Sequence, residues 1–313
     1  MMQSCHPATR TGNLPSLVVA GAEKSATTMI AAVLGEHPAV EMAPGEVFDL
    51  RDQYYEAGSL DALRRRFTGS TDLRRGFRCA DYMGWAEVPA RLARDLSTPD
   101  VMFTLREPVR RAIGAWYRYV RLGLLPVEQP NAAFTRILRG DVEGYAFPYA
   151  REKILEWGLY GRHLQHRFDS FPPTKVHVIF DFELRKDAEH SITTLYRELD
   201  LDPAFHPTMH HRRHNAGVYS LTRLRWLRLR HRWTWRLEDD GIWTSARPTR
   251  PLPALGNAAV VATDRLILSH MTRSEPEPLD PETMRQLHAY YRSDILLLED
   301  LCQVDLRQWL DCW

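Results

Sequence analysis

Residues 17–28 of this 313-residue chain read LVVAGAEKSATT, and this stretch decides the fold. Leu17 to Ala20 form a short apolar run, which predicts a buried strand that ends at Gly21. From Thr28 onward apolar residues recur at helical spacing and predict a helix that stops near Gly35. A strand, a tight polar loop and a helix can bind an anion, because the loop N–H groups and the positive end of the helix dipole converge on one point.

The loop differs from a Walker A motif, which places its lysine next to a Ser or Thr at the end of a longer Gly-x4-Gly-Lys loop. Lys24 follows Gly21 by three positions, and a pair of threonines comes after it. It is one of only four lysines in the chain, whereas arginine fills nearly all other basic positions. We interpret Lys24 as a point charge near a small anion, with added hydroxyl donors from Ser25, Thr27 and Thr28. The alternative is a surface helix whose lysine is solvated.

The composition is that of an ordinary globular protein, with 44% hydrophobic and 26% charged residues. The net charge of +1 gives no bulk attraction to nucleic acid, so nucleic-acid binding is not expected. Four widely spaced cysteines predict free thiols in a reducing compartment, with a Cys302–Cys312 contact as the alternative: Cys5, Cys79, Cys302 and Cys312. The chain has no apolar run of transmembrane length and no recognisable signal peptide, so we expect a cytoplasmic protein. Residues 1–13 are polar and expected to be loose.

A second buried strand, predicted at 101–105, ends on Arg106-Glu107-Pro108. Open α/β sheets bind ligands at the carboxyl ends of their strands, so Arg106 is a candidate for bidentate phosphate binding. The alternative is a salt bridge with Glu107 or a nearby carboxylate. A third strand at 176–181 ends in Asp181, as a Walker B strand would, although we favour a structural role for this aspartate.

Glu46 follows a Pro-Gly turn and is set beside apolar neighbours shortly after the first helix. A carboxylate in that place can face the anion site and act as a general base. The alternative is a solvated loop glutamate.

Residues 210–236 combine arginines with leucines and tryptophans. One interpretation is an Arg-rich surface helix packed on the core. The other is a lid or a helix that contacts a membrane surface through 221–236. His210, His211 and His214 have no matching acid or thiol spacing, so no metal site is predicted. Residues 237–278 are Pro-rich and predicted to be irregular, with one helix near 258–270.

Other helices are predicted by apolar periodicity at 59–67, 85–97, 109–122, 151–168, 187–199 and 279–300. No helix is predicted within 123–150, which is rich in Gly, Pro and aromatic residues.

Seven segments in one order resemble those of sulfotransferases that use 3′-phosphoadenosine 5′-phosphosulfate (PAPS). GAEKSATT, with its helix and His37-Pro38, resembles the 5′-phosphosulfate loop, and FTLREPVRRAIGAWY at 103–117 resembles the 3′-phosphate segment. GEVF at 45–48 and GFRCADYM at 76–83 are similar to segments of heparan-type members. The later similarities are at 158–184, 214–219 and 278–309, so the resemblance covers Leu14 to Trp309.

The resemblance implies an α/β fold: a single P-loop-type domain at 14–313, with a central parallel sheet flanked by helices and an acceptor-side or lid region at 210–278. Residues 123–150 would wrap the acceptor side. It implies PAPS as co-substrate, with no metal. The implied donor-binding residues are Ala22, Glu23, Lys24, Ser25, Ala26, Thr27, Thr28, Arg106, Gly114 and Arg273. The implied catalytic residues are Glu46 as base, with Lys24 and Arg78 stabilising the leaving phosphate.

The chain also departs from the family pattern. Ala26 replaces the loop glycine, so its backbone must avoid positive φ or be strained. Gly45 replaces a frequent lysine, and Phe77 replaces a glutamate. Gly114 stands where the family has a serine that helps to bind the 3′-phosphate, and a lost hydroxyl contact to a charged group costs about 1.5–3 kcal/mol.

The predicted function is sulfuryl transfer from PAPS to a hydroxyl group or an amine of a small-molecule, glycolipid or secondary-metabolite acceptor. Such transfer asks a protein mainly for positioning and charge stabilisation. Two alternatives remain: a P-loop small-molecule kinase that uses Asp181 for Mg²⁺, and a non-catalytic protein that binds a nucleotide or a lipid surface.

Overall fold

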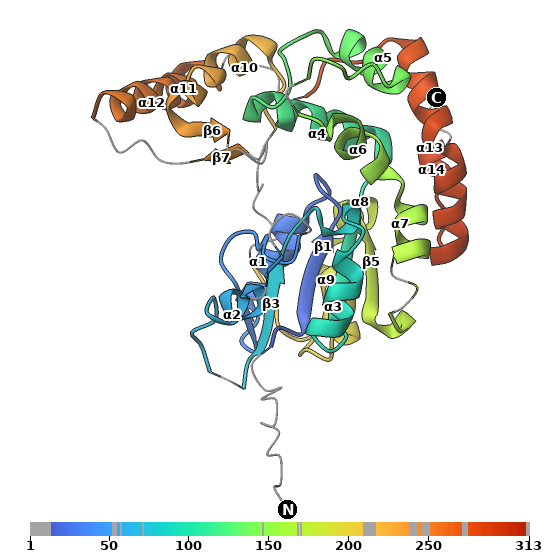
Figure 1. The fold of residues 1–313 in the computed structure, drawn as a ribbon. Helices are drawn as coiled ribbons and strands as arrows, with labels where there is room; N and C mark the ends of the chain where they lie inside the picture. The colour runs from blue at the N-terminus through green and yellow to red at the C-terminus, as the bar shows by residue number, and fades with distance from the viewer. Residues whose placement is uncertain are drawn as a thin grey trace, which may run out of the picture. The chain divides into compact units, whose positions relative to one another are not determined.

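The computed structural model describes residues 14–51, 55–56, 58–70, 72–145, 147–167, 169, 171–208, 217–237, 243–245, 251–270 and 275–310. These residues group into two compact units, and Figure 1 labels their elements. The first unit comprises residues 1–107, 160–214 and 296–305, and the second comprises the rest. The prediction of a single domain at 14–313 stays a prediction.

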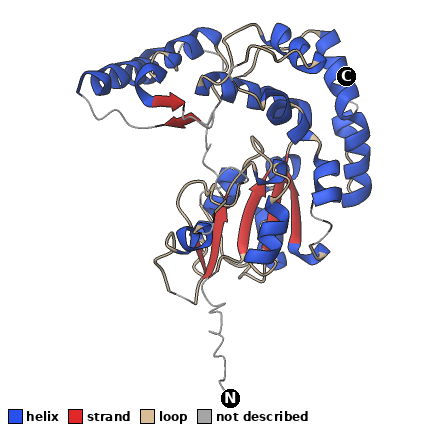
Figure 2. Ribbon diagram, viewed as in Figure 1, coloured by secondary structure: helices blue, strands red, loops and turns tan. Residues whose placement is uncertain are grey.

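The first unit is an α/β layer built on a five-stranded parallel sheet in the order β2-β3-β1-β4-β5 (Figure 2). Its strands are β1 (Leu17–Gly21), β2 (Val40–Met42), β3 (Arg74–Arg78), β4 (Asp100–Leu105) and β5 (Val176–Phe180). Its helices are α1 (Thr27–Glu36), α2 (Ser59–Arg64), η2 (Tyr82–Gly84), α3 (Val88–Asp95), α7 (Tyr160–Arg167), η4 (Pro173–Lys175), α8 (Asp181–Lys186) and α9 (Ala188–Glu198). This confirms the predicted fold class.

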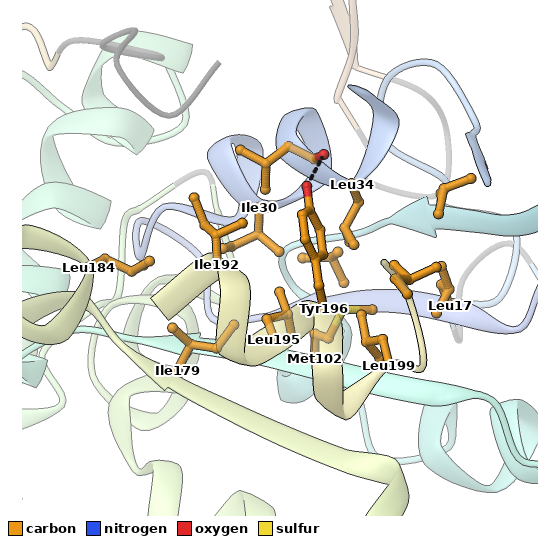
Figure 3. Packing of buried hydrophobic residues seen from close by; sticks show 14 residues of the cluster. Leu17, Ile30, Leu34, Met102, Ile179, Leu184, Ile192, Leu195, Tyr196 and Leu199 are labelled. Carbon is orange, nitrogen blue, oxygen red and sulfur yellow. Dashed lines mark hydrogen bonds between the residues drawn. The ribbon is translucent and has the colours of Figure 1, made fainter. Parts of the chain in front are cut away.

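The strands form because their apolar residues can be buried on both faces of the sheet. All five residues of β1 and all six of β4 are buried, as expected of a parallel sheet covered by helices. On one face α1 and α9 supply Ile30, Leu34, Ile192 and Leu195 to a common core with Leu17 (Figure 3). The Tyr196 hydroxyl donates to the Val33 carbonyl at 2.8 Å and so ties α9 to α1.

The second unit is mainly helical. Its elements are α4 (Pro108–Leu122), α5 (Pro130–Arg139), α6 (Ala150–Ile154), η3 (Glu156–Gly158), α10 (Leu221–Arg228), α11 (His231–Thr234), β6 (Trp235–Leu237), β7 (Trp243–Ser245), α12 (Pro251–Thr263), η6 (Asp264–Leu268) and α14 (Arg307–Leu310). The long helix α13 (Pro281–Cys302) belongs to this unit up to Ile295.

Three sequence predictions are corrected here. Helix α5 lies within 123–150, where no helix was predicted, and its Pro130 is in the first turn, where proline is tolerated. The single helix predicted at 151–168 is divided into α6, η3 and α7. Residues 237–278 are less irregular than predicted, because α12 starts at Pro251 and is followed directly by the π-turn η6.

Two further observations concern the cysteines and the membrane. Cys79 and Cys302 are free thiols, as predicted, whereas Cys5 and Cys312 lie outside the described residues. No helix within the described ranges is long and apolar enough to cross a membrane.

Candidate functional site

The loop between β1 and α1 holds two non-glycine residues in the left-handed backbone region. Lys24 has φ of 67°, and Ala26, which directly precedes α1, has φ of 69°. A residue with a Cβ pays roughly 1–2 kcal/mol for this conformation. Of the two outcomes that the sequence left open for Ala26, strain at positive φ is the one observed. Strain of this kind persists only where the surrounding structure imposes it, and it is common at ligand-binding sites.

The same loop contains polar groups that the protein does not satisfy. Ser25 is 1% exposed, yet its Oγ has no hydrogen-bond partner in the part of the chain that the structure describes. The first N–H groups of α1, which starts at Thr27, have no acceptor within the helix, as at any helix N-terminus. Helix α1 has no acidic residue in its first turn and no capping side chain. Buried polar groups are nearly always paired in folded proteins, so this set of donors fits an anionic ligand.

The rest of the loop is fixed by the neighbouring strand. Ala22 donates its N–H to the Thr104 carbonyl at 2.8 Å and accepts from the Ser25 N–H at 3.2 Å, so its own N–H is used within the protein. The Thr104 hydroxyl donates to the Gly21 carbonyl at 3.3 Å. Thr104 was not predicted as a site residue. Its signal in the sequence is a hydroxyl group inside the otherwise apolar run of β4.

The remaining predicted loop residues differ in exposure. Glu23 and Thr27 are buried, at 7% and 4% exposed. Lys24 and Thr28 are partly buried, whereas Ala26 is exposed. The Lys24 side chain is therefore not fully exposed to solvent. The anion-site interpretation requires this partial burial.

Glu46 and Arg78, predicted separately as catalytic residues, form an ion pair. Arg78 Nη1 donates to Glu46 Oε1 at 2.6 Å, and both side chains are largely buried. The pair forms because the chain after β2 continues along β3, where the Val47 N–H donates to the Arg78 carbonyl at 2.8 Å. Gly45 turns the chain just before Glu46 with φ of 76°, a conformation that glycine adopts without strain. Glu46 Oε2 has no partner among the described residues.

Arg106 follows β4 and lies beside the carboxylate of Asp181, which begins α8 after β5. Arg106 Nε is 3.7 Å from Asp181 Oδ2, and Arg185 Nη2 is 3.2 Å from the same oxygen. Arg106 Nε is buried without a hydrogen bond. Asp181 thus pairs with two guanidinium groups, and its structural role stays a prediction.

These groups share one edge of the sheet. The loop after β1, Arg78 at the end of β3 and Arg106 after β4 all follow carboxyl ends of parallel strands, and β1 pairs with both β3 and β4. The chain runs from β1 toward β2 on one side and from β4 toward β5 on the other, so the direction of the connections reverses between β1 and β4. Open α/β sheets bind ligands at such a switch point.

Two predicted residues lie elsewhere in the chain. Gly114 is buried within α4, in the second unit. Arg273 lies outside the described residues. No group of three or more His, Cys, Asp or Glu side chains that could hold a metal ion occurs in the described ranges.

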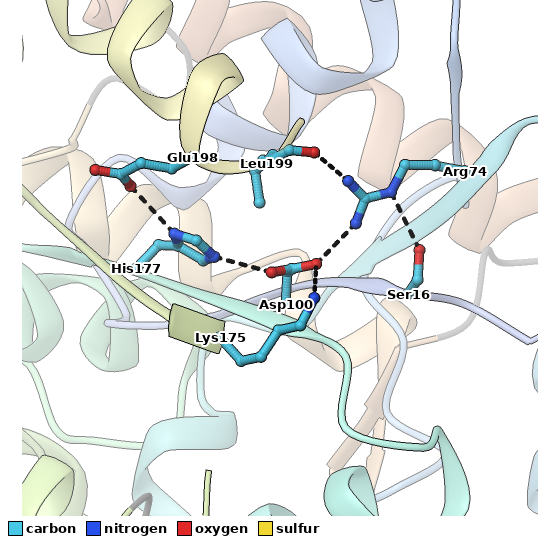
Figure 4. Close-up of polar contacts among 7 residues, drawn as sticks. All are labelled: Ser16, Arg74, Asp100, Lys175, His177, Glu198 and Leu199. Atoms are coloured by element: carbon cyan, nitrogen blue, oxygen red, sulfur yellow. Dashed lines mark hydrogen bonds and ion pairs between the residues drawn. The ribbon is translucent and has the colours of Figure 1, made fainter. Parts of the chain in front are cut away.

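The opposite, amino-terminal edge of the sheet carries a different polar cluster (Figure 4). Asp100 accepts from Arg74 Nη2 at 2.8 Å and from Lys175 Nζ at 3.0 Å, while its other oxygen is 3.0 Å from His177 Nε2. His177 Nδ1 lies 3.1 Å from Glu198. Burial alone would raise the pKa of Asp100, but the hydrogen bonds from His177, Lys175 and Arg74 and the positive charge of Lys175 lower it to about 2.

Three solved structures are similar to this chain. The crystal structure of a sulfotransferase from Alicyclobacillus acidocaldarius covers 94% of this chain and 98% of its own, with a TM-score of 0.64 and 16% identity. Mouse sulfotransferase SULT7A1 complexed with PAP covers 93% and 89%, with a TM-score of 0.46 and 13% identity. The sulfotransferase domain from the curacin biosynthetic pathway covers 88% and 96%, with a TM-score of 0.40 and 12% identity.

No protein-family model and no curated protein sequence matches the chain. The structural match to the bacterial enzyme shows that the chain has a sulfotransferase fold.

Proposed function

We propose that this chain transfers a sulfuryl group from PAPS to a hydroxyl group or an amine of a small-molecule, glycolipid or secondary-metabolite acceptor. The observation that carries the proposal is the buried, unpartnered Ser25 hydroxyl in the loop between β1 and α1. The shared fold with a sulfotransferase is consistent with it.

The loop would bind the 5′-phosphosulfate. The N–H groups of Ala26 and Thr27, the Ser25 hydroxyl and the positive end of α1 supply donors for its oxygens. Thr27 and Thr28 would add hydroxyl donors, and Glu23 would shape the buried part of the loop. Lys24 would neutralise the charge that develops on the leaving phosphate, since a lysine ammonium is a compact point charge. The bound donor supplies the sulfuryl group.

Glu46 would accept the proton of the attacking acceptor. Its Oε1 is held by Arg78, while Oε2 has no partner among the described residues and can take the proton. Arg78 would orient the carboxylate through Nη1 and direct its remaining N–H groups at the transferring group. Arg78 would therefore have two roles: it positions the Glu46 carboxylate and stabilises charge on the transferring group.

Arg106 would bind the 3′-phosphate. Its Nε is buried without a hydrogen bond and only 3.7 Å from Asp181, which leaves the outer guanidinium nitrogens for a ligand. Arginine suits this task because its planar fork binds phosphate oxygens in pairs. Gly114 and Arg273 remain candidate donor contacts on the resemblance alone.

The test is calorimetry with 3′,5′-adenosine bisphosphate in the presence of a chelator, followed by turnover on a panel of phenols, alcohols, sugars and amines. We expect metal-free binding in about the micromolar range and release of 3′,5′-adenosine bisphosphate with at least one acceptor. Binding of ATP only with Mg²⁺ would favour the kinase. Nucleotide binding without turnover on any acceptor would favour the non-catalytic protein.

A further inference from the structure

An exposed apolar surface lies on α12 and η6 of the second unit. Leu252 and Leu255 are 79% and 67% exposed, and Leu266 and Ile267 are 75% and 52% exposed. Six of the ten large apolar side chains that are exposed among the described residues fall between Leu229 and Ile267. Such a concentration marks an interaction surface, since singly scattered apolar residues are the normal condition of a protein surface.

The apolar residues of α12 form one continuous face. Leu252, Leu255, Ala259 and Ala262 follow one another at spacings of three, four and three residues, and all are exposed. These spacings place them on one side of the helix. The helix itself contains no charged residue. Its exposed side therefore offers hydrocarbon alone to whatever covers it.

The other side of α12 packs against α10 and α11, so the face that carries Leu252 and Leu255 points away from them. Trp226 of α10 donates its indole N–H to the Val260 carbonyl at 3.0 Å. A Cβ at Gly256 would come within 2.8 Å of the Trp233 ring, so the glycine permits that ring to approach. Arg223 holds Asp264 with two bonds, at 2.5 and 2.9 Å. Figure 1 shows α12 running alongside α10 and α11; together with β6, β7 and η6 we call these elements the α10–α12 lobe.

Arginines outnumber carboxylates in the lobe. Within the described residues of 217–270 there are seven arginines and one carboxylate, Asp264, which Arg223 occupies. Counted over all of 217–270, nine arginines stand against four carboxylates. Arg225, Arg228, Arg230 and Arg265 have no carboxylate partner among the described residues. The pKa of Arg121 is lowered by burial and then by the nearby charges of Arg230 and Arg223, which agrees with an excess of positive charge.

We propose that the α10–α12 lobe docks on a lipid membrane that contains anionic headgroups. The leucines of α12 and η6 would enter the boundary between headgroups and acyl chains, and the partnerless arginines would meet the lipid phosphates. Exposed leucines on α12 and η6, together with an excess of arginine in the same lobe, are features of elements that lie in the membrane interface. A second copy of the chain is a poorer occupant, because a symmetric contact would bring the same unbalanced arginines together. We favour an anionic membrane over a second copy because the negative headgroups complement the arginines of the lobe.

Co-sedimentation with vesicles tests the proposal and needs no turnover. The full chain is mixed with vesicles of phosphatidylcholine alone or with about a third of phosphatidylserine, at low and at high salt. We expect binding to the anionic vesicles, weakened by salt because the headgroup attraction is screened. Leu252→Ser/Leu255→Ser should lower the partition coefficient by about tenfold or more, and Arg225→Gln/Arg265→Gln by about fivefold or more.

Matched controls exist in the chain. Leu296 and Leu301 on α13 are exposed at 46% and 42%, and Arg139 on α5 is exposed. Leu296→Ser/Leu301→Ser and Arg139→Gln should bind vesicles as the parent does, and circular dichroism should show all variants folded. The proposal is overturned if the parent ignores anionic vesicles at low salt, or if the lobe variants bind as well as the controls. It is also overturned if sedimentation velocity without lipid reveals an oligomer that only the leucine variants dissociate.

Discussion

The two edges of the central sheet differ in how completely their polar groups are satisfied. At the amino edge, both oxygens of Asp100 and both ring nitrogens of His177 have partners within 3.1 Å. At the carboxyl edge, the buried Ser25 hydroxyl has none, and Lys24 and Ala26 hold left-handed backbones. The same parallel strands run from one edge to the other. The polar groups at the amino edge are satisfied within the protein, whereas those at the carboxyl edge need a ligand.

The contrast assigns different tasks to the two edges. Paired buried charges contribute to stability only while every partner is present, and removing one leaves the others uncompensated. Unpaired donors and strained backbone instead cost stability in the free protein and are repaid when a ligand binds. We therefore expect loss of a functional side chain at the carboxyl edge to alter binding and turnover, relief of its backbone strain to raise the free energy of unfolding, and loss of a partner at the amino edge to lower that free energy. Five predictions test this division, from the largest expected effect to the smallest.

The largest effect is expected for Glu46→Gln. Loss of the proton-accepting carboxylate should lower kcat by about 10²–10⁴-fold, with little change in the Kd of 3′,5′-adenosine bisphosphate. Release of the bisphosphate with an acceptor from the panel measures it. The matched control is Glu41→Gln, since Glu41 also pairs with an arginine, Arg75, but at β2. Equal turnover of Glu46→Gln and the parent at matched donor occupancy would remove Glu46 from the mechanism.

Asp100→Asn should lower the free energy of unfolding by about 3 kcal/mol, because a buried network loses its central charge. Urea unfolding measures it, and donor affinity per folded molecule should stay unchanged. Asp61→Asn is the control, because the Asp61–Arg64 pair is exposed and worth no more than about 0.5 kcal/mol. A weaker donor affinity in Asp100→Asn, with unchanged stability, would contradict the division between the edges.

Arg106→Ala should raise the Kd of 3′,5′-adenosine bisphosphate by about 10–100-fold, the worth of a charge-assisted contact to phosphate. Calorimetry measures it. Arg185→Ala removes the other guanidinium that contacts Asp181 and should leave the Kd nearly unchanged. If both variants weaken binding alike, Arg106 acts through Asp181 rather than on the ligand.

Stability should fall toward both acid and base because of the amino edge. The pKa of Asp100 is lowered to about 2, so its contribution of about 2 kcal/mol is present above about pH 4 and is lost as pH falls toward 2. Burial alone would lower the pKa of His177, but hydrogen bonds to Asp100 and Glu198 raise it. Its contribution is therefore complete below the unfolded value of about 6.5 and is lost as pH rises through the folded one.

Denaturant midpoints measured from pH 2 to 9 test this pH dependence. Asp100→Asn should flatten the acid limb, and His177→Gln should flatten the basic limb. If the denaturant midpoint falls as steeply toward high pH in His177→Gln as in the parent, another group causes the loss of stability.

The smallest effect is expected for Ala26→Gly. Glycine relieves the left-handed strain but adds freedom to the unfolded chain, so a net gain of about 0.5–1 kcal/mol is expected. Thermal unfolding measures it. Ala32→Gly, in the middle of α1, should instead destabilise by about 1 kcal/mol. If Ala26→Gly and Ala32→Gly lower the stability by similar amounts, residue 26 carries no backbone strain.

Apolar runs were sufficient to predict the central strands. β1, β4 and β5 read as buried strands because both of their faces are covered, and the loop after β1 was recognised by its polarity and spacing. The periodicity of α1, α9 and α13 predicted these helices in nearly their observed ranges. Pro130 and Pro251 led to errors, because a proline in the first turn of a helix resembles a break when only its type is considered.

Contacts between distant segments could not be predicted. Glu46 and Arg78 were each proposed from local features, but their pairing depends on β2 lying next to β3, and strand order is not written in local sequence. The Asp100 cluster draws on β3, β4, β5 and α9, none of which signals the others. That Lys24, Glu46 and Arg106 act on one substrate stays a prediction.

The strand order has a consequence for the behaviour of the protein at high concentration. β2 and β5 are the outer strands of the sheet, and an unprotected outer strand can pair with another molecule. β2 offers only three residues, and β5 carries an imidazole held between two carboxylates. A short strand on one side and fixed charge on the other both oppose intermolecular pairing. We therefore expect chains that lose the Asp100 cluster to form fibrils sooner than chains altered in the loop after β1.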